Sequence, residues 1–189
     1  NVVKKEKIAE DGDYNLSADR YLVATDYSNV KWPIVRLGEV IKINFGERIT
    51  KRNQSGTKYP VYGGGGESFR TDNFNRDNEY VISRFAMAEN CVRYVEGQFW
   101  LMDSGGTFSI NKEYEEKLDK NFIGNLLLNK QKDIFMCARG GAQKNLNVDH
   151  FYELKIPLPP IEVQKEIVAE FNSYQKIIDG ARQVVGNRS

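Results

Sequence analysis

A proline pair followed at once by a long amphipathic segment constrains the fold of this chain more than any other feature. The stretch Lys155-Ile-Pro-Leu-Pro-Pro160 is typical of an extended apolar strand that ends at two prolines. Proline lacks the N–H donor that a sheet ladder needs, yet its fixed φ suits the first turn of a helix. The helical pattern runs from Ile161 to Val185. At about 1.5 Å per residue it predicts a rod of roughly 40 Å.

The apolar positions of this segment recur at alternating steps of four and three residues. They are Ile167, Phe171, Tyr174, Ile178, Ala181 and Val185. This 3.5-residue repeat is the spacing of a coiled-coil seam, whereas a helix in the core of its own domain carries a broader apolar stripe. We therefore predict a projecting helix that pairs with a partner helix. The alternative is a terminal helix that packs on its own domain.

Length and composition favour one folded domain with an appendage. The chain has 189 residues, of which 40% are hydrophobic and 12% aromatic, values typical of a globular protein. No apolar run approaches the roughly 20 residues that cross a bilayer, and the first residues lack the apolar region of a signal peptide. We expect a cytoplasmic protein without membrane contact. Because the chain does not begin with methionine, we also expect a fragment or a processed piece.

The sequence offers little material for metal binding or catalysis. Cys91 and Cys137 are far apart without CxxC spacing, and we interpret both as buried small hydrophobic residues. His150, the single histidine, has no cysteine pair or second histidine nearby and is interpreted as a structural or surface residue. No GxSxG, HExxH or GxxxxGK[ST] pattern occurs. The sequence therefore predicts no metal site and no catalytic residue.

The pattern of apolar and polar residues predicts an α+β fold, in which a strand-rich mixed domain precedes the long helix. Residues 1–30 form a polar lead-in, 31–158 the domain and 159–189 the helix. Strands are predicted at 59–62, 79–84, 91–95, 99–102 and 107–110, after a strand and a short helix or second strand at 32–42. A helix that carries Tyr114, Leu118, Phe122 and Leu126 follows, and then a break at the glycines of 139–141.

Cations gather in the polar loops of this domain. Arg48, Lys51, Arg52 and Lys58 occur in one segment that contains no acidic residue, together with Asn53 and Gln54. Arginine binds guanine, and asparagine or glutamine binds adenine, in bidentate fashion, while lysine chiefly senses phosphate charge. The other candidates are Arg70, Arg76, Arg84, Arg139, Gln143, Lys144 and Asn145. The set predicts contacts to double-stranded DNA, although the net charge of only +1 and each cation alone also fit a solvated surface.

The glycine run Gly63–Gly66 allows another interpretation. Glycines after a strand can cradle a phosphate, which would suit a small enzyme that binds an anionic ligand. The run lacks a following Lys-Ser/Thr pair, and glycine runs are frequent in ordinary turns. We rank this interpretation last.

Several phrases, in this order, resemble the specificity subunit of type I restriction-modification enzymes, in particular a target-recognition domain with the helix that follows it. The phrases are WPIVRLGEV from Trp32, YPVYGGGG from Tyr59, YVISR from Tyr80, GGAQKNL from Gly140 and IPLPPIEVQ from Ile156. Residues 13–21 also resemble the closing residues of adenine-methylating partner subunits. The methylase turn Asn-Pro-Pro-Tyr/Phe is absent, so no methyl transfer is assigned to this chain.

The resemblance implies a non-catalytic reader of one half of a split DNA target, with the helix as a spacer that pairs with a counterpart. Implied partners are double-stranded DNA, an adenine methyltransferase subunit or domain, a restriction/translocase subunit, and a second specificity half or a second copy of the chain. No cofactor is expected in this chain, and S-adenosylmethionine only in the partner methylase. The sequence departs from the family pattern at Phe85-Ala86, where glycine is frequent, and at Lys144, where proline is common. The alternative is an assembly module that uses the helix without sequence-specific DNA binding.

Overall fold

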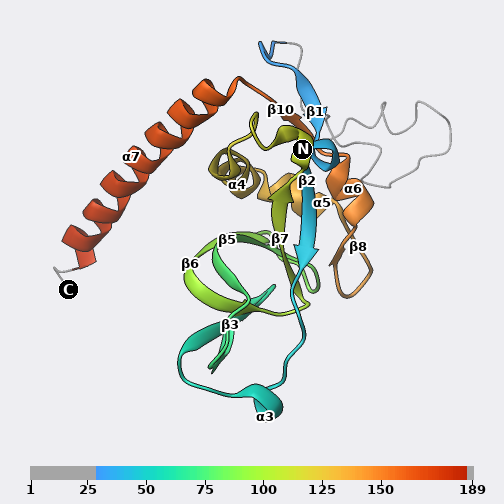
Figure 1. The fold of residues 1–189 in the computed structure, drawn as a ribbon, viewed down its shortest axis with the longest axis vertical. Coiled ribbons are helices and arrows are strands. Elements are labelled where there is room, and N and C mark those ends of the chain that lie inside the picture. Colours follow the sequence, from blue (N-terminus) through green and yellow to red (C-terminus); the bar gives the residue numbers. More distant parts are fainter. Residues whose placement is uncertain (1–28, 187–189) are drawn as a thin grey trace, which may run out of the picture. The chain divides into compact units, whose positions relative to one another are not determined.

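A computed structural model describes residues 29–186 of the chain, with side chains described as far as residue 183. The chain divides into two units, Asn1–Lys31 and Trp32–Ser189, and the second holds every helix and strand of this described part. The lead-in predicted for residues 1–30 lies almost entirely outside the described residues. The architecture is α+β, as predicted, with most strands in one main sheet and a long helix at the end (Figure 1).

The elements follow one another in a mixed order. They are β1 (Ile34–Arg36), α2 (Leu37–Val40), β2 (Ile41–Phe45), α3 (Lys51–Gln54), β3 (Tyr59–Gly63), β4 (Gly66–Thr71), β5 (Arg76–Ser83), β6 (Val92–Leu101), β7 (Gly105–Ile110), η2 (Lys112–Tyr114), α4 (Lys120–Asn129), α5 (Gln131–Met136), β8 (Ala138–Arg139), β9 (Asn145–Leu146), α6 (Val148–Tyr152), β10 (Lys155–Pro157) and α7 (Ile161–Gly186).

The main sheet has six strands in the order β2-β7-β5-β6-β3-β4. Neighbouring strands are antiparallel except β3 and β6, which run parallel. Two small antiparallel pairs complete the strand pairing. The first joins β1 to β10, with Val35 opposite Ile156, so the chain enters and leaves the domain through adjacent strands. The second is the hairpin of β8 and β9.

Two apolar clusters stabilise the two faces of the sheet. The larger joins the sheet to the helices and contains Ile43, Ile82, Phe108, Ile123, Ile134 and Phe151 among its buried side chains. The smaller contains Val81, Val95, Phe99 and Leu101, with Tyr62 packed against it. Val81 and Ile82 are neighbours in β5 yet belong to different clusters, because successive side chains of a strand point to opposite faces.

The strand prediction omitted β4, β8 and β9, and it was wrong where two strands were expected at 91–95 and 99–102. The structure has one strand, β6, over Val92–Leu101. Gly97 within it has a φ of +74°, and its N–H donates to Asn78 Oδ1 at 2.9 Å on β5, where the pairing is irregular. Glycine adopts this left-handed backbone without steric cost, so the strand continues through a bulge instead of ending.

The helix prediction around 114–126 was also wrong in its start. The 3-10 turn η2 ends at Tyr114, and α4 begins only at Lys120. Asp119 determines this start because its carboxylate accepts from the N–H groups of Asn121 and Phe122 at 2.8 and 2.9 Å. A side chain that satisfies the first free N–H groups of a helix fixes its N-terminus.

The terminal helix is present as predicted, and α7 begins directly after the proline pair. Its first turns are joined to the domain, since Gln164 is fully buried and Val168 packs on the larger apolar cluster. From residue 172 to residue 183 every side chain is exposed. Within residues 29–186, no helix is long and apolar enough to span a membrane.

Candidate nucleic-acid interface

The predicted cationic loop contains a short helix and lies at one end of the domain. Helix α3 forms from Lys51 to Gln54, and Figure 1 places it at the end of the sheet opposite β1 and β10. Ile49, which is 6% exposed, anchors the segment to the domain, while residues 50–55 are all exposed. The sequence predicted this segment as a loop, and one turn of helix is what the structure adds.

Both ends of this segment are held by hydrogen bonds. At its start, the Trp100 indole N–H donates to the Glu47 carbonyl at 2.9 Å, and the Glu47 N–H donates to the Leu101 carbonyl at 2.9 Å. At its end, the guanidinium of Arg70 donates to the carbonyls of Thr57 and Lys58 at 2.8 and 2.5 Å. The cations of α3 are thus presented by a segment that is fixed at both ends.

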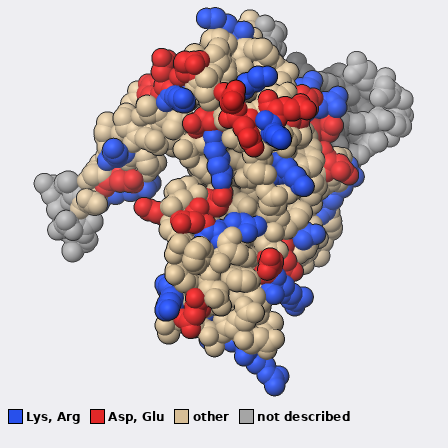
Figure 2. All heavy atoms as spheres, in the orientation of Figure 1, with Lys and Arg blue, Asp and Glu red and all other residues tan. Residues whose placement is uncertain are grey.

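Four predicted cations of this segment are available to a partner. Arg48, Lys51, Arg52 and Lys58 are exposed and form no ion pair with a carboxylate of the described residues. Figure 2 shows the corresponding contrast: basic atoms project at the α3 end of the view, whereas red and blue atoms are mixed over the upper part. Arg70 differs, because it pairs with Glu67 at 3.5 Å in addition to its two carbonyl contacts. Its role in this structure is to support the loop.

A second group of predicted residues meets where the β8–β9 hairpin contacts the chain that leaves β5. The Leu146 N–H donates to the Arg84 carbonyl at 2.8 Å, and the Ala86 N–H donates to Asn145 Oδ1 at 3.3 Å. The Gln143 amide nitrogen donates to the same Asn145 oxygen at 3.2 Å. Residues 84–86 and 143–146, almost sixty positions apart, therefore form one polar surface.

The hairpin also carries Arg139 and Lys144, both exposed. Arg139 Nη2 lies 3.0 Å from Nε2 of His150, which is exposed on α6 as its surface interpretation required. Cys91 and Cys137 are free and buried, as predicted, and desolvation raises the pKa of each thiol to about 11.

The glycine run forms the turn of a hairpin, with Gly63 opposite Gly66 at the junction of β3 and β4. The Gly64 carbonyl accepts from Ser83 Oγ at 2.7 Å and from Arg93 Nη2 at 2.8 Å, and its N–H donates to Ser104 Oγ at 3.3 Å. Ser104 in turn accepts from the Arg84 N–H at 2.9 Å through its carbonyl. The glycine turn is therefore connected to the polar surface of the β8–β9 hairpin.

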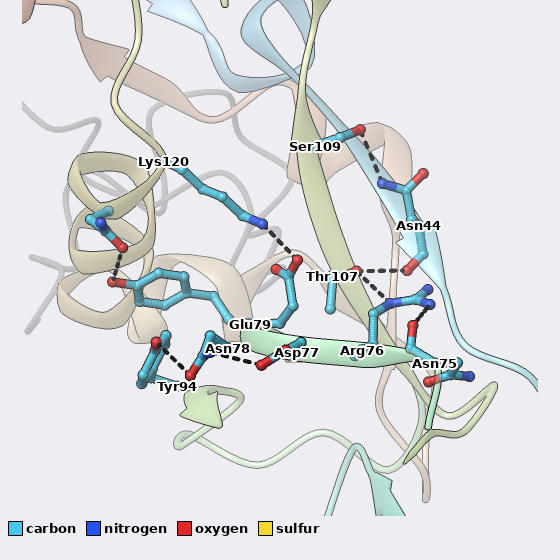
Figure 3. Close-up of polar contacts among 12 residues, drawn as sticks. Asn44, Asn75, Arg76, Asp77, Asn78, Glu79, Tyr94, Thr107, Ser109 and Lys120 are labelled. Atoms are coloured by element: carbon cyan, nitrogen blue, oxygen red, sulfur yellow. Dashed lines mark hydrogen bonds and ion pairs between the residues drawn. The ribbon is translucent and has the colours of Figure 1, made fainter. Parts of the chain in front are cut away.

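Arg76 lies away from both groups, in a polar hollow between the sheet and α4 (Figure 3). Its guanidinium donates to Thr107 Oγ1 at 3.1 Å and to two carbonyls, those of Asn75 at 2.8 Å and Phe45 at 3.2 Å. Close by, Lys120 Nζ lies 2.6 Å from Glu79 Oε1, and the other carboxylate oxygen of Glu79 is buried without a hydrogen-bond partner in the described part of the chain. In this structure Arg76 stabilises the junction of β5 with β2 and β7.

Two residues next to these surfaces were not among the candidates drawn from the sequence. Arg93 contacts the glycine turn from β6, and Phe85, noted only as a departure from the family pattern, lies beside Arg84. Nothing in the linear order separates Arg93 from the cations of other strands. Its place follows from the antiparallel pairing of β5 with β6, which sets Arg93 opposite Val81, two residues from the Ser83 that also contacts Gly64. Phe85 had one signal, an apolar residue in a polar loop.

The family model of the type I restriction modification DNA specificity domain matches residues 29–184. The chain belongs to this family. Residues 29–184 contain the target-recognition phrases from which the resemblance was drawn, and the match confirms it. A comparison with curated proteins finds no match.

Solved structures of the same kind share the fold. The S subunit of a type I restriction-modification system from M. genitalium is similar with a TM-score of 0.70 and 20% identity, over 87% of this chain and 44% of that chain. The HsdS subunit from Thermoanaerobacter tengcongensis is similar with a TM-score of 0.57 and 19% identity, over 82% and 40%. A structure that describes complex assembly and conformational transition of the type I R-M system gives 0.60 and 19%, over 85% and 42%. The specificity domain described here thus spans less than half the length of each matched chain.

Proposed function

We propose that this chain is the sequence-specific DNA recognition module of a type I restriction-modification system and reads one half of a split target. The observation that carries the proposal is the α3 segment, residues 48–58. Its four cations are exposed and pair with no carboxylate of the described residues, and hydrogen bonds hold the segment at both ends. Cations in such a segment position a duplex through its phosphates, and neighbouring amides such as Asn53 and Gln54 are suited to base edges. The polar surface of the β8–β9 hairpin supplies a second set of amide and cationic groups.

DNA binding by the intact complex of this chain with its methylase tests the proposal. A pool of randomised duplexes selects the target, and the selected duplex is then titrated against a scrambled one over a salt series. Replacing Lys51 and Arg52 by alanine is expected to lower affinity by about 10- to 100-fold and to reduce the slope of log K against log salt by about 2, since each phosphate contact contributes about 0.9.

The matched control replaces Lys112 and Lys132, two exposed lysines outside the α3 segment, by alanine. This pair removes the same charge and is expected to change the salt slope by much less. Equal affinity of the unaltered complex for selected and scrambled duplexes, or equal slopes for both pairs of substitutions, contradicts the proposed role of α3. Gln143→Ala is expected to relax selection at single positions with little change in the slope, because an amide carries no charge.

We further propose that α7 pairs with the corresponding helix of a second specificity half or a second copy, and so fixes the spacing of the half-sites. The seam supports this: Ile167, Tyr174 and Ile178 are 43%, 57% and 45% exposed, so large apolar side chains stand uncovered on the described helix. Phe171 is half-buried and Ala181 exposed, while the side chain of Val185 lies outside the described ones. We expect the methylase and restriction subunits to assemble on this pair, with S-adenosylmethionine bound by the methylase.

Two adjacent isoleucines test the pairing. Ile178 lies on the seam and Ile177, which is 67% exposed, lies beside it. Ile178→Ser is expected to weaken association by about 2 kcal/mol for each isoleucine buried, whereas Ile177→Ser is expected to cost less than half of that. Sedimentation equilibrium of the full chain measures both. Equal effects of the two substitutions contradict the heptad assignment. Unaltered association of both variants favours a helix that does not mediate assembly.

A further inference from the structure

The segment that leaves β5 contains a residue in an unfavourable backbone conformation. Ala86 has a φ of +47°, in the left-handed region where a Cβ crowds the neighbouring carbonyl and where glycine is preferred. Only Asn78 shares a positive φ among the non-glycine residues of the described chain. A strained position of this kind persists when its surroundings hold it, and such positions gather at functional sites.

The β8–β9 hairpin holds this conformation from both sides. The N–H of Ala86 itself donates to Asn145 Oδ1 at 3.3 Å. One residue on, the Met87 N–H donates to the Lys144 carbonyl at 2.8 Å, and the Met87 side chain is only 7% exposed. One residue before Phe85, the Arg84 carbonyl accepts from the Leu146 N–H at 2.8 Å. Phe85 is thus flanked by anchored residues and has little freedom to turn inward.

The phenyl ring of Phe85 is held at the surface beside a cation. Its side chain is 37% exposed, and the guanidinium carbon of Arg84 lies 4.8 Å from the ring centre. The same guanidinium lies 4.1 Å from the ring of Phe45, so Arg84 is in contact with two aromatic rings. A cation against a ring face supports that ring from one side, while the exposed part of Phe85 stays open to a partner.

The hairpin that anchors both flanks of Phe85 carries polar hydrogen-bonding groups. Gln143, Lys144 and Arg139 are exposed on the adjacent hairpin. Amide and cationic groups of this kind bind base edges and phosphates, whereas a large apolar side chain beside them is suited to an apolar group of a base. In the major groove, the one apolar group that a base presents is the C5-methyl group of thymine.

We propose that Phe85 is a specificity-determining residue that contacts a thymine methyl group in the bound half-site. The proposal rests on the DNA recognition proposed above and adds a residue and a base chemistry to it. The left-handed Ala86 and its bond to Asn145 fix the backbone of Phe85 next to the hairpin that carries the amide groups of Gln143 and Asn145.

Removal of the methyl group from the DNA provides the test. The intact complex is titrated with its selected duplex and with duplexes in which each thymine of the half-site is replaced in turn by deoxyuridine. We expect the unaltered complex to lose roughly fourfold in affinity at one position, the value of one buried methyl-sized group. In the Phe85→Ala complex the thymine and deoxyuridine duplexes are expected to bind equally at that position.

Phe74→Ala is the matched control, because Phe74 is also an exposed phenylalanine, at 44%, but its ring contacts that of Tyr59 in a tilted arrangement, with 5.1 Å between ring centres. It is expected to leave the thymine-to-deoxyuridine ratio at the Phe85 position unchanged. Ala86→Gly relieves the strain and keeps the backbone N–H groups that bond to the hairpin, so it is expected to keep the ratio above one.

The outcomes separate this inference from the function on which it rests. If the unaltered complex selects no sequence at all, the proposed function fails. If it selects a sequence but binds deoxyuridine and thymine equally throughout the half-site, Phe85 contacts no methyl group and the inference is overturned. The same holds if Phe85→Ala weakens both duplexes by the same factor, which is the result expected of a wedge between base steps or of a purely structural ring.

Discussion

Replacement of Gln164 by alanine is expected to lower the free energy of unfolding of the domain by about 4 kcal/mol, because each buried polar group left unpaired costs about 1–3 kcal/mol. Gln164 is fully buried in the first turns of α7. Its Oε1 accepts from the Asp119 N–H at 2.8 Å, and its Nε2 donates to the carbonyls of Lys117 and Pro159 at 2.9 and 2.7 Å. Alanine leaves all three backbone groups without this partner, in a cavity of a side chain's size.

The measurement is equilibrium urea unfolding of the full chain, with the midpoint as the readout at unchanged slope. Gln175→Ala is the control within the same helix: Gln175 is exposed and makes one bond, at 2.9 Å to Asp179 Oδ1. Its loss is expected to change stability by less than about 0.5 kcal/mol. A Gln164→Ala protein within 1 kcal/mol of the parent would show that water or repacking satisfies the three groups and that the assignment is wrong.

The same three bonds connect α7 to the rest of the domain. Pro159 ends the segment before α7, and Lys117 and Asp119 lie immediately before α4, whose N-terminus Asp119 caps. One side chain therefore fixes the start of α7 against the start of α4. The direction in which the exposed part of α7 leaves the domain depends on this junction, so we expect Gln164→Ala also to loosen the spacing between paired half-sites.

The parts of the fold that the sequence predicted are those that local chemistry determines. The proline pair Pro159-Pro160 disfavours continuation of β10 and suits the first turn of a helix, and the heptad positions predicted α7. The error at Gly97 arose where a partner distant in sequence decides the outcome, whereas the error at the start of α4 came from a local cap, Asp119, that the helical period alone did not reveal. Gly97 is a strand breaker by composition, but its pairing with Asn78 carries β6 through. Leu118 fits a helical period, yet the cap at Asp119 starts the helix later.

The candidate interface shows the same division. Lys51 and Arg52 could be found from the sequence because no acidic residue occurs between Arg48 and Lys58. In the structure both side chains are exposed and pair with no carboxylate of the described residues. Arg70 and Arg76 were candidates as cations of polar stretches, but β4 and β5 turn their guanidinium groups onto backbone carbonyls. The junction of residues 84–86 with the β8–β9 hairpin had no sequence signal, since it depends on the tertiary approach of segments almost sixty residues apart.

Gly64→Ala is expected to destabilise the domain by about 3 kcal/mol, at the upper end of what an added methyl group costs in a closely packed site. A Cβ at this position would lie 2.5 Å from the Ser104 carbonyl oxygen and 3.2 Å from Ser83 Cα. These neighbours are backbone atoms of the segments that meet at Arg84, so they cannot rotate away as a flexible side chain would. Relief requires the β3–β4 turn to move off the sheet.

Gly65→Ala, one residue on, is the matched control because a Cβ there meets nothing within 4 Å. We expect it to be neutral in urea unfolding, whereas Gly64→Ala lowers the midpoint and also exposes the hairpin of 59–71 to limited proteolysis. Equal stability of the two proteins would contradict the close packing of Gly64.

The Gly64→Ala and Gly65→Ala proteins also distinguish the two possible roles of Gly63–Gly66. A phosphate cradle at Gly63–Gly66 would make both substitutions reduce affinity for inorganic phosphate or a nucleotide, since either Cβ obstructs the approach of an anion to the backbone. If the glycine turn instead supports the polar surface through Ser83 and Ser104, only the substitution at Gly64 is expected to matter. In that case the stability loss and the loss of DNA affinity in the intact complex are expected to occur together, in Gly64→Ala and not in Gly65→Ala.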